Sequence, residues 1–209
     1  MILADIGSDW YISGTPDDRW NNEALHVLGQ IHGEDFQMVD SARIGIDYVG
    51  TLRADLIEAN DKANTMRGRN GNDTLFGFGD DDVLKGGRGG DRLDGGTGSD
   101  LLNGGAGRDT FIFTTAPDAG SVDVIQGFSS DDDTIRLDHT FFAGLAAGPL
   151  DADAFHIGSA AEDAEDRIIY DRKTGLIAFD ADGAGGIDAI AFARIANLAA
   201  VRSGDFDIV

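Results

Sequence analysis

Apolar residues recur every nine positions through the middle of the chain. In successive nine-residue units the eighth residue is Leu75, Leu84, Leu93, Leu102 and Phe111. This pattern predicts a short strand in each unit, with position eight pointing inward and positions seven and nine (Thr74 and Phe76, Arg92 and Asp94) facing outward. A three-residue strand buries too little apolar surface to be stable alone. A constant period of this length therefore indicates a solenoid of stacked units.

The same units carry glycine and aspartate at fixed places. In the unit "GGRGGDRLD", which starts at Gly86, glycine occupies positions one, two and four and aspartate position six. Stepping backwards gives two degenerate units, "GTLRADLIE" and "ANDKANTMR", which keep Asp55 and Asn64 at position six but lose the inner glycines. We therefore define seven units over residues 50–112. Since glycine inside a strand or helix costs roughly 0.5–1 kcal/mol relative to alanine, something must offset that cost in every unit.

Calcium is the ligand that best explains these loops. It takes 6–8 oxygen ligands at about 2.3–2.6 Å, and a glycine-rich loop with a carboxylate offers such oxygens. The pattern GGxGxDxUx is the calcium-binding nonapeptide of RTX proteins, and residues 50–112 strongly resemble that repeats-in-toxin family. The resemblance implies an all-β fold built on a parallel β-roll, in which two nonapeptides make one turn and calcium lies between loops of alternate units. A flexible Gly-Asp linker is disfavoured, because linkers do not keep an apolar residue in frame.

The resemblance also implies the ligands. The side chains would come from the aspartates at position six: Asp73, Asp82, Asp91, Asp100 and Asp109. Backbone carbonyls would come from positions one to four: Gly68, Asn70, Gly77, Gly79, Gly86, Gly87, Arg88, Gly89, Gly95, Gly96, Thr97, Gly98, Gly104, Gly105, Ala106 and Gly107. Three calcium sites look complete, namely Asp73 with Asp91, Asp82 with Asp100, and Asp91 with Asp109. Two more would involve Asp55 or Asn64. The unit "GFGDDDVLK" has Phe78 and Asp80 where glycine is usual, so a weaker or distorted site is expected there.

The flanks of the repeats suggest two further segments. Residues 113–209 alternate apolar and polar residues, and their first part resembles the segment after the repeats of serralysin-type proteins, which implies a C-terminal antiparallel β-sandwich cap; Gly127 stands where that family usually has an acid. "RIIYDRKTGLIAFDADGAGGIDAIAFARI" predicts a meander with turns at 171–175 and 180–186. Residues 1–49 read as a small α/β segment, with a strand at "MILADIG" and a helix over "WNNEALHVLGQI", and we interpret it as the remnant of a larger upstream domain.

Composition narrows the partners. The 209 residues include 38 acidic and 16 basic side chains, for a net charge of −22. This charge argues against nucleic acid as a binding partner and favours the binding of cations. The sequence contains no run of 18 apolar residues, which is the pattern expected of a membrane-spanning helix. It also contains no cysteine. The first residues lack the pattern of a cleaved secretory signal. The last five, "DFDIV", are similar to type I secretion signals, so we expect an extracellular protein exported by that machinery.

The sequence does not predict an enzyme. None of the four histidines lies in an H-E-x-x-H motif, and no G-x-S-x-G elbow is present. Two alternatives to a structural and export module remain open. The chain is the tail of an extracellular enzyme (protease, lipase, polysaccharide lyase or epimerase), or it is a carbohydrate-binding or adhesin module whose basic residues bind an acidic extracellular polysaccharide. The roll carries eight basic against 11 acidic residues, and the simpler explanation is that these cations partly neutralise the aspartates.

Overall fold

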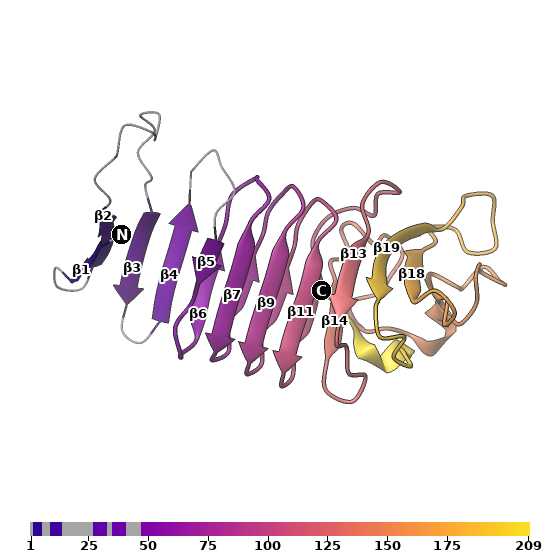
Figure 1. Cartoon of the computed structure of the whole chain (residues 1–209). Coiled ribbons are helices and arrows are strands. Elements are labelled where there is room, and N and C mark those ends of the chain that lie inside the picture. Colours follow the sequence, from indigo (N-terminus) through magenta and orange to yellow (C-terminus); the bar gives the residue numbers. More distant parts are fainter. Residues whose placement is uncertain (1, 6–8, 14–26, 33–34, 41–46) are drawn as a thin grey trace.

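The computed structural model describes the whole chain except residues 1, 6–8, 14–26, 33–34 and 41–46 (Figure 1). Side-chain environments are described from Asp47 onward. The described helices are two three-residue 3-10 turns, η1 (Ala152–Ala154) and η2 (Ser203–Asp205), and neither is long or apolar enough to cross a membrane.

The strands of the described residues lie in two sheets. Sheet A contains, in spatial order, β1 (Ile2–Asp5), β2 (Asp9–Ser13), β3 (Val27–His32), β4 (Asp35–Asp40), β6 (Asp55–Glu58), β8 (Thr74–Phe76), β10 (Arg92–Asp94), β12 (Thr110–Phe113), β14 (Thr134–Leu137), β20 (Phe206–Ile208) and β15 (Gly148–Pro149). Sheet B contains β16 (Phe155–His156), β17 (Ile168–Tyr170), β18 (Leu176–Phe179), β19 (Ile190–Ile195), β13 (Asp123–Gln126), β11 (Leu101–Ala106), β9 (Val83–Arg88), β7 (Thr65–Asn70) and β5 (Asp47–Val49).

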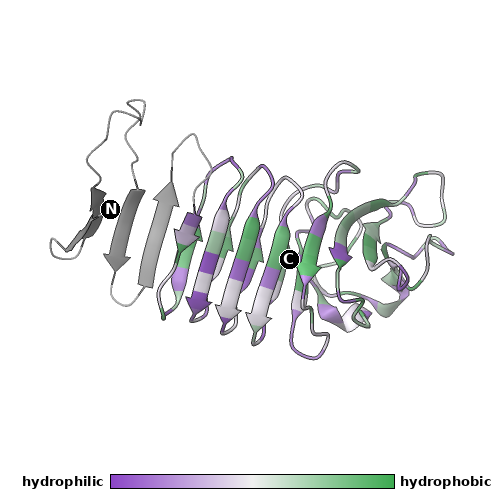
Figure 2. Ribbon diagram, in the orientation of Figure 1, coloured by the Kyte–Doolittle hydropathy of each residue, from purple (hydrophilic) through white to green (hydrophobic). Residues whose placement is uncertain are grey.

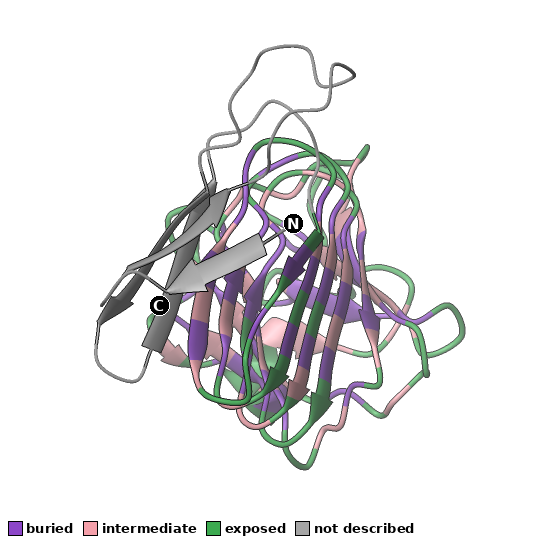
Figure 3. Cartoon of the chain, turned by 60° about the vertical axis from the view of Figure 1, so that its left-hand side comes forward, coloured by how far each residue is buried: buried purple, intermediate pink, exposed green. Residues whose placement is uncertain are grey.

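The repeats form a parallel β-roll. The chain crosses from sheet B to sheet A and back, so that each strand pairs in parallel with the strand 18 residues further on; Leu75 lies beside Leu93, and Leu84 beside Leu102. The apolar residues at position eight are fully buried between the sheets, as predicted. Figure 2 shows apolar segments that repeat from strand to strand along the roll, and buried positions recur at matching levels of successive strands in Figure 3.

Two details of the roll differ from the sequence-based expectation. Sheet B strands such as β9 have six residues rather than three, because pairing continues into the first positions of the next unit. Asp94, at position nine, is buried rather than facing outward. Thr114, in the chain that follows β12, donates its hydroxyl proton to the Asp94 carboxylate at 2.8 Å. Asp94 is therefore covered by a segment outside the repeats.

Both sheets continue past residue 112 without a break. β13 pairs in parallel with β11, and β14 with β12, so the chain makes a further turn of the roll after the last nonapeptide. β19 and β20 then add to these strands in parallel. β17, β18 and β19 form the predicted antiparallel meander.

The core of this C-terminal region is aromatic. Phe142 contacts both Phe179 and Phe192 edge-on, with ring centroids 5.3 and 5.0 Å apart, and Phe113 meets Phe192 in the same way. These geometries are the favoured ones for aromatic pairs and add to the apolar area that the rings bury. The region therefore has a dense apolar core, unlike the repeats, which contribute one inward side chain per strand.

The N-terminal strands extend sheet A. β1 pairs antiparallel with β2, as the strand prediction for the first residues requires, and β4 joins the roll by pairing in parallel with β6. The predicted helix over residues 20–31 falls partly outside the described residues. Where it is described the prediction is wrong, since Val27–His32 forms strand β3. Pairing with β4 along all six residues overrides the weak helical spacing.

Candidate metal centre

The aspartates at position six form two columns, one on each side of the roll. One column contains Asp55, Asp73, Asp91 and Asp109, and the other contains Asn64, Asp82 and Asp100. In each column the Oδ1 atom accepts the backbone N–H of the residue 18 positions earlier, at 2.7–2.9 Å. This is the alternate-unit stacking that the resemblance to RTX repeats implies.

The columns continue beyond the repeats, which the sequence reading missed. Asp100 donates its N–H to Asp123 at 2.9 Å, and Asp109 donates to Asp133 at 3.0 Å. The spacings are 23 and 24 residues instead of 18. A usable signal was present, because "SVDVIQ" and "DDDTIRL" match the end of the repeat units "GNDTLF" and "DDDVLK".

The second carboxylate oxygen, Oδ2, is the one that is available to a ligand. Oδ2 of Asp73, Asp82, Asp91 and Asp100 is buried and has no hydrogen-bond partner in the described part of the chain. A buried polar oxygen without a partner is unfavourable by a few kcal/mol, and more if it is charged. Native proteins rarely leave such atoms unpaired, so four in register indicate a ligand.

Backbone carbonyls converge on the same atoms. A Cβ added to Gly68 would lie 2.1 Å from Asp73 Oδ2 and 2.8 Å from the Gly86 carbonyl oxygen; at Gly77 the corresponding distances to Asp82 Oδ2 and the Gly95 carbonyl are 2.2 and 2.5 Å. Each pair of oxygens is therefore within about 5 Å, the range open to two ligands of one calcium ion with Ca–O distances of about 2.3–2.6 Å. Glycine at position one leaves this space free.

Glycines at positions two and four allow the loops to stack closely. A Cβ on Gly89 would lie 1.6 Å from the Gly71 carbonyl oxygen, and Gly89 also has φ +133°, a conformation that L side chains rarely adopt. The departing residues Phe78 and Asp80 keep positive φ values of 74° and 66°. Their unit follows the backbone path of its neighbours despite those side chains, and Asp82 keeps its place in the column.

The first loop of each column is filled by hydrogen bonds instead. The Asp55 carboxylate accepts the backbone N–H and the hydroxyl of Thr51. The Asn64 side chain donates to the Asn60 carbonyl at 3.0 Å. Calcium sites involving Asp55 or Asn64 therefore lack the unpaired buried oxygen that marks the inner loops.

Burial changes the acidity of the columns. It raises the pKa of Asp73 and Asp82 from 3.8 to about 7, with a further increase from the charge of the next aspartate in each column. Burial likewise raises the pKa of Asp100 and Asp109 to about 6. Without a cation the ionised columns are thus unfavourable, and protons compete with any metal that binds them.

A metal in these columns must also use the backbone. No group of three or more histidine, aspartate or glutamate side chains in the described residues is arranged to hold an ion. Of the predicted carbonyl ligands, those of Gly86 and Gly95, at position one, lie close to the unpaired carboxylate oxygens of Asp73 and Asp82. The carbonyls of Arg88 and Ala106, at position three, accept backbone N–H groups of Gly71 and Gly89.

Comparison with known proteins identifies the repeats. A family profile described as the RTX calcium-binding nonapeptide repeat (4 copies) matches residues 49–77 and 76–111. No curated protein matches the chain. Among solved structures, the AlgE6R3 subunit of the Azotobacter vinelandii mannuronan C5-epimerase aligns with 20% identity over 89% of this chain and 85% of that chain, at a TM-score of 0.40. Residues 49–111 of the chain are therefore RTX repeats, a repeat that binds calcium.

Proposed function

We propose that this chain is a structural module that folds when calcium binds between the stacked loops of its roll. The ions lie in the gaps between Asp73 and Asp91, Asp82 and Asp100, and Asp91 and Asp109. The observation that carries this proposal is the row of buried, unpaired Oδ2 atoms, of which those of Asp73 and Asp82 lie close to a carbonyl oxygen of the next loop in their column. Calcium supplies the positive charge that these oxygens lack.

Calcium binding also switches the roll between an unfolded and a folded state. Stacked carboxylates repel one another without a cation, so the metal-free roll is expected to be largely unfolded. Calcium binds only the folded arrangement and stabilises it by mass action. In this account the roll stays unfolded where calcium is scarce and folds outside the cell.

Circular dichroism during a calcium titration tests this function. Starting from chain treated with EGTA, millimolar calcium should produce a β spectrum and a cooperative thermal transition. Magnesium is the control, because it demands tight octahedral geometry and sheds water reluctantly. An unchanged spectrum with calcium, or equal refolding by magnesium, contradicts the proposal.

Export by a type I system fits the state of the last residues in the folded chain. Phe206 and Ile208 are buried in β20, and Arg136 forms an ion pair with Asp207 at 2.8 Å. A transporter that recognises this segment must therefore bind it before the chain folds. Co-expression with a type I transporter should release the intact chain into the medium, whereas a chain with residues 205–209 scrambled should stay in the cell.

Binding of an acidic polysaccharide is a second candidate, favoured by a row of cations. Arg67 and Lys85 are exposed and lie side by side on β7 and β9, and the exposed Arg88 continues β9. A glycan array with calcium tests it, with an Arg67→Gln/Lys85→Gln variant as comparison. Equal signals from both proteins contradict this function and leave the calcium-dependent fold untouched.

A further inference from the structure

One of the four unpaired oxygens is not explained by calcium between repeats. In the function proposed above, calcium between repeat loops uses the unpaired Oδ2 atoms of Asp73, Asp82 and Asp91, which accounts for three ions. Asp100 ends the repeats of its column, yet its Oδ2 is also buried and unpaired among the described residues. Asp100 as a whole is only 1% exposed. The next layer beyond it is the non-repeat segment 115–123.

That segment is built to close the column. Asp123 accepts the N–H of Asp100 through Oδ1 at 2.9 Å, as each repeat aspartate does for the one before it. Thr115 donates its hydroxyl proton to the Gly96 carbonyl at 3.1 Å, and the Ser121 hydroxyl donates to the Gly98 carbonyl. Between repeat loops, the carbonyls at positions two and four face the glycines of the next loop, as those of Phe78 and Asp80 face Gly96 and Gly98. At the junction the two hydroxyls take the place of those glycines.

Negative charge gathers at this junction. Asp94, Asp100 and Asp123 are all at least nine-tenths buried, and Asp94 Oδ1 is a second buried oxygen without a described partner. Burial, and after it the charges of Asp100 and Asp94, raise the pKa of Asp123 to about 8. No lysine or arginine in the described region forms an ion pair with any of the three.

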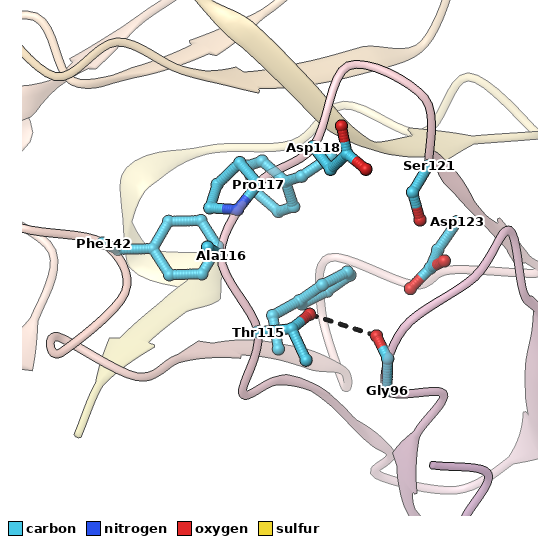
Figure 4. Close-up of a pocket in the computed structure, with 10 residues that line it drawn as sticks. Gly96, Thr115, Ala116, Pro117, Asp118, Ser121, Asp123 and Phe142 are labelled. Carbon is cyan, nitrogen blue, oxygen red and sulfur yellow. Dashed lines mark hydrogen bonds between the residues drawn. The ribbon is translucent and has the colours of Figure 1, made fainter. Parts of the chain in front are cut away.

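A small pocket lies beside the junction. Asp123 lines this pocket of about 20 Å³ together with Gly96, Thr115, Ser121 and the aromatic residues Phe113, Phe142 and Phe192, whereas Asp94 and Asp100 do not line it (Figure 4). Figure 4 shows the Asp123 carboxylate and the Gly96 carbonyl oxygen on the same side of this pocket. Carboxylate, carbonyl and hydroxyl oxygens are the ligands that calcium prefers.

The other column ends differently. The carboxylate of Asp133 accepts the N–H of Ser129 at 2.9 Å through the oxygen that is not used by Asp109. The Phe128 carbonyl at the start of that loop accepts the side-chain amide of Asn197 at 2.9 Å. Hydrogen bonds fill this end, as they do around Asp55 at the start of the roll.

We propose that the junction between residues 95–100 and 115–123 binds an additional calcium ion, with the carboxylates of Asp100 and Asp123 as ligands and Asp94 as a third negative charge beside them. The proposal rests on the calcium-dependent function proposed above. It places a metal site outside the repeat motif, on the first turn of the roll that the nonapeptides do not form.

Counting bound ions tests the proposal. Equilibrium dialysis of the full chain against buffered calcium should give one ion fewer for Asp123→Asn than for the wild type, while Asp133→Asn, the matched change at the hydrogen-bonded column end, keeps the wild-type number. Equal numbers for Asp123→Asn and the wild type overturn the proposal but not the function. No bound calcium in the wild type overturns both.

A second variant covers the case in which Asp123→Asn does not fold. Asp94→Asn leaves both columns of hydrogen bonds intact and removes one charge from the junction. Its calcium titration should show a single ion weakened about tenfold or more, with the remaining ions unchanged. Unchanged affinity for every ion contradicts a site at this junction.

Discussion

The repeats and the C-terminal region share two sheets but are stabilised in different ways. The repeats bury one aliphatic side chain per strand and leave carboxylate oxygens unpaired in the interior. The C-terminal region buries interlocking aromatic rings such as Phe142 and Phe192. Its buried Asp166 is satisfied by the backbone N–H of Glu162 at 2.8 Å. With the function proposed above, one continuous pair of sheets combines a part that needs a cation with a part that is stable through packing.

The largest expected effect comes from removing calcium, which should separate the two regions. In EGTA, peptides from residues 65–112 should lose nearly all protection from hydrogen exchange, because the repelling columns lie there. Peptides from residues 168–195 should keep measurable protection through the aromatic core. Hydrogen-exchange mass spectrometry with and without calcium measures both. Equal loss in the two regions contradicts the distinction drawn between them.

Adding one methyl group inside the stack should also be severe. Gly89→Ala places a Cβ against the Gly71 carbonyl at a residue with positive φ, so the calcium-bound roll should lose at least about 2–3 kcal/mol of unfolding free energy. Gly204→Ala is the control, since no heavy atom lies within 4 Å of its added Cβ. Thermal unfolding in saturating calcium compares them. A Gly89→Ala variant as stable as Gly204→Ala contradicts the observed loop stacking.

Protonation should stabilise the metal-free roll, as calcium does, but by a smaller amount. The folded pKa values of Asp73 and Asp82 are raised to about 7, above the ordinary 3.8, so the folded metal-free chain binds more protons than the unfolded chain between these values. Metal-free stability should be greatest below about pH 4 and fall as pH rises to about 7. Calcium affinity should rise over the same range, because calcium needs the ionised carboxylates.

Thermal melts of metal-free chain at several pH values, with calcium titrations at the same values, measure both trends. The C-terminal turn at Asp171 offers an internal contrast: hydrogen bonds from Lys173 and Thr174 lower its pKa. Metal-free stability that increases from pH 4 to pH 7 would show that the buried columns do not dominate the acid response.

The fold of the repeats could be predicted from the sequence, because equivalent strands and loops require the same residue types at the same positions of every unit. Leucine at position eight predicted the inward face, and the resemblance to RTX repeats, in which two nonapeptides make one turn, implied the pairing of Leu75 with Leu93. Asp123 and Asp133 escaped detection because insertions lengthen the spacing while the chain still returns to the same column. Asp94 was misplaced because its cover comes from Thr114, outside the repeat, and local alternation carries no information about such a contact.

The repeat motif also does not show in which loops the aspartate carboxylate is hydrogen-bonded and in which it keeps an unpaired oxygen. Asp55 and Asp91 occupy the same position of the repeat, but only Asp55 has a threonine hydroxyl and N–H within reach. Which aspartates are open to a cation depends on where each loop ends up relative to its neighbours. The sequence reading ranked Asp55 lower because its loop lacks glycine, and the hydrogen bonds from Thr51 supply a physical reason for the same ranking.

The most direct test of the account compares calcium binding by Asp91→Ala and Asp55→Ala with that of the wild type. Asp91 belongs to two of the three proposed repeat sites, with Asp73 on one side and Asp109 on the other, whereas Asp55 is hydrogen-bonded to Thr51. Equilibrium dialysis should show two ions lost from Asp91→Ala and none from Asp55→Ala. If Asp55→Ala loses as many ions as Asp91→Ala, calcium does not bind where unpaired carboxylates face the next loop, and the central claim is wrong.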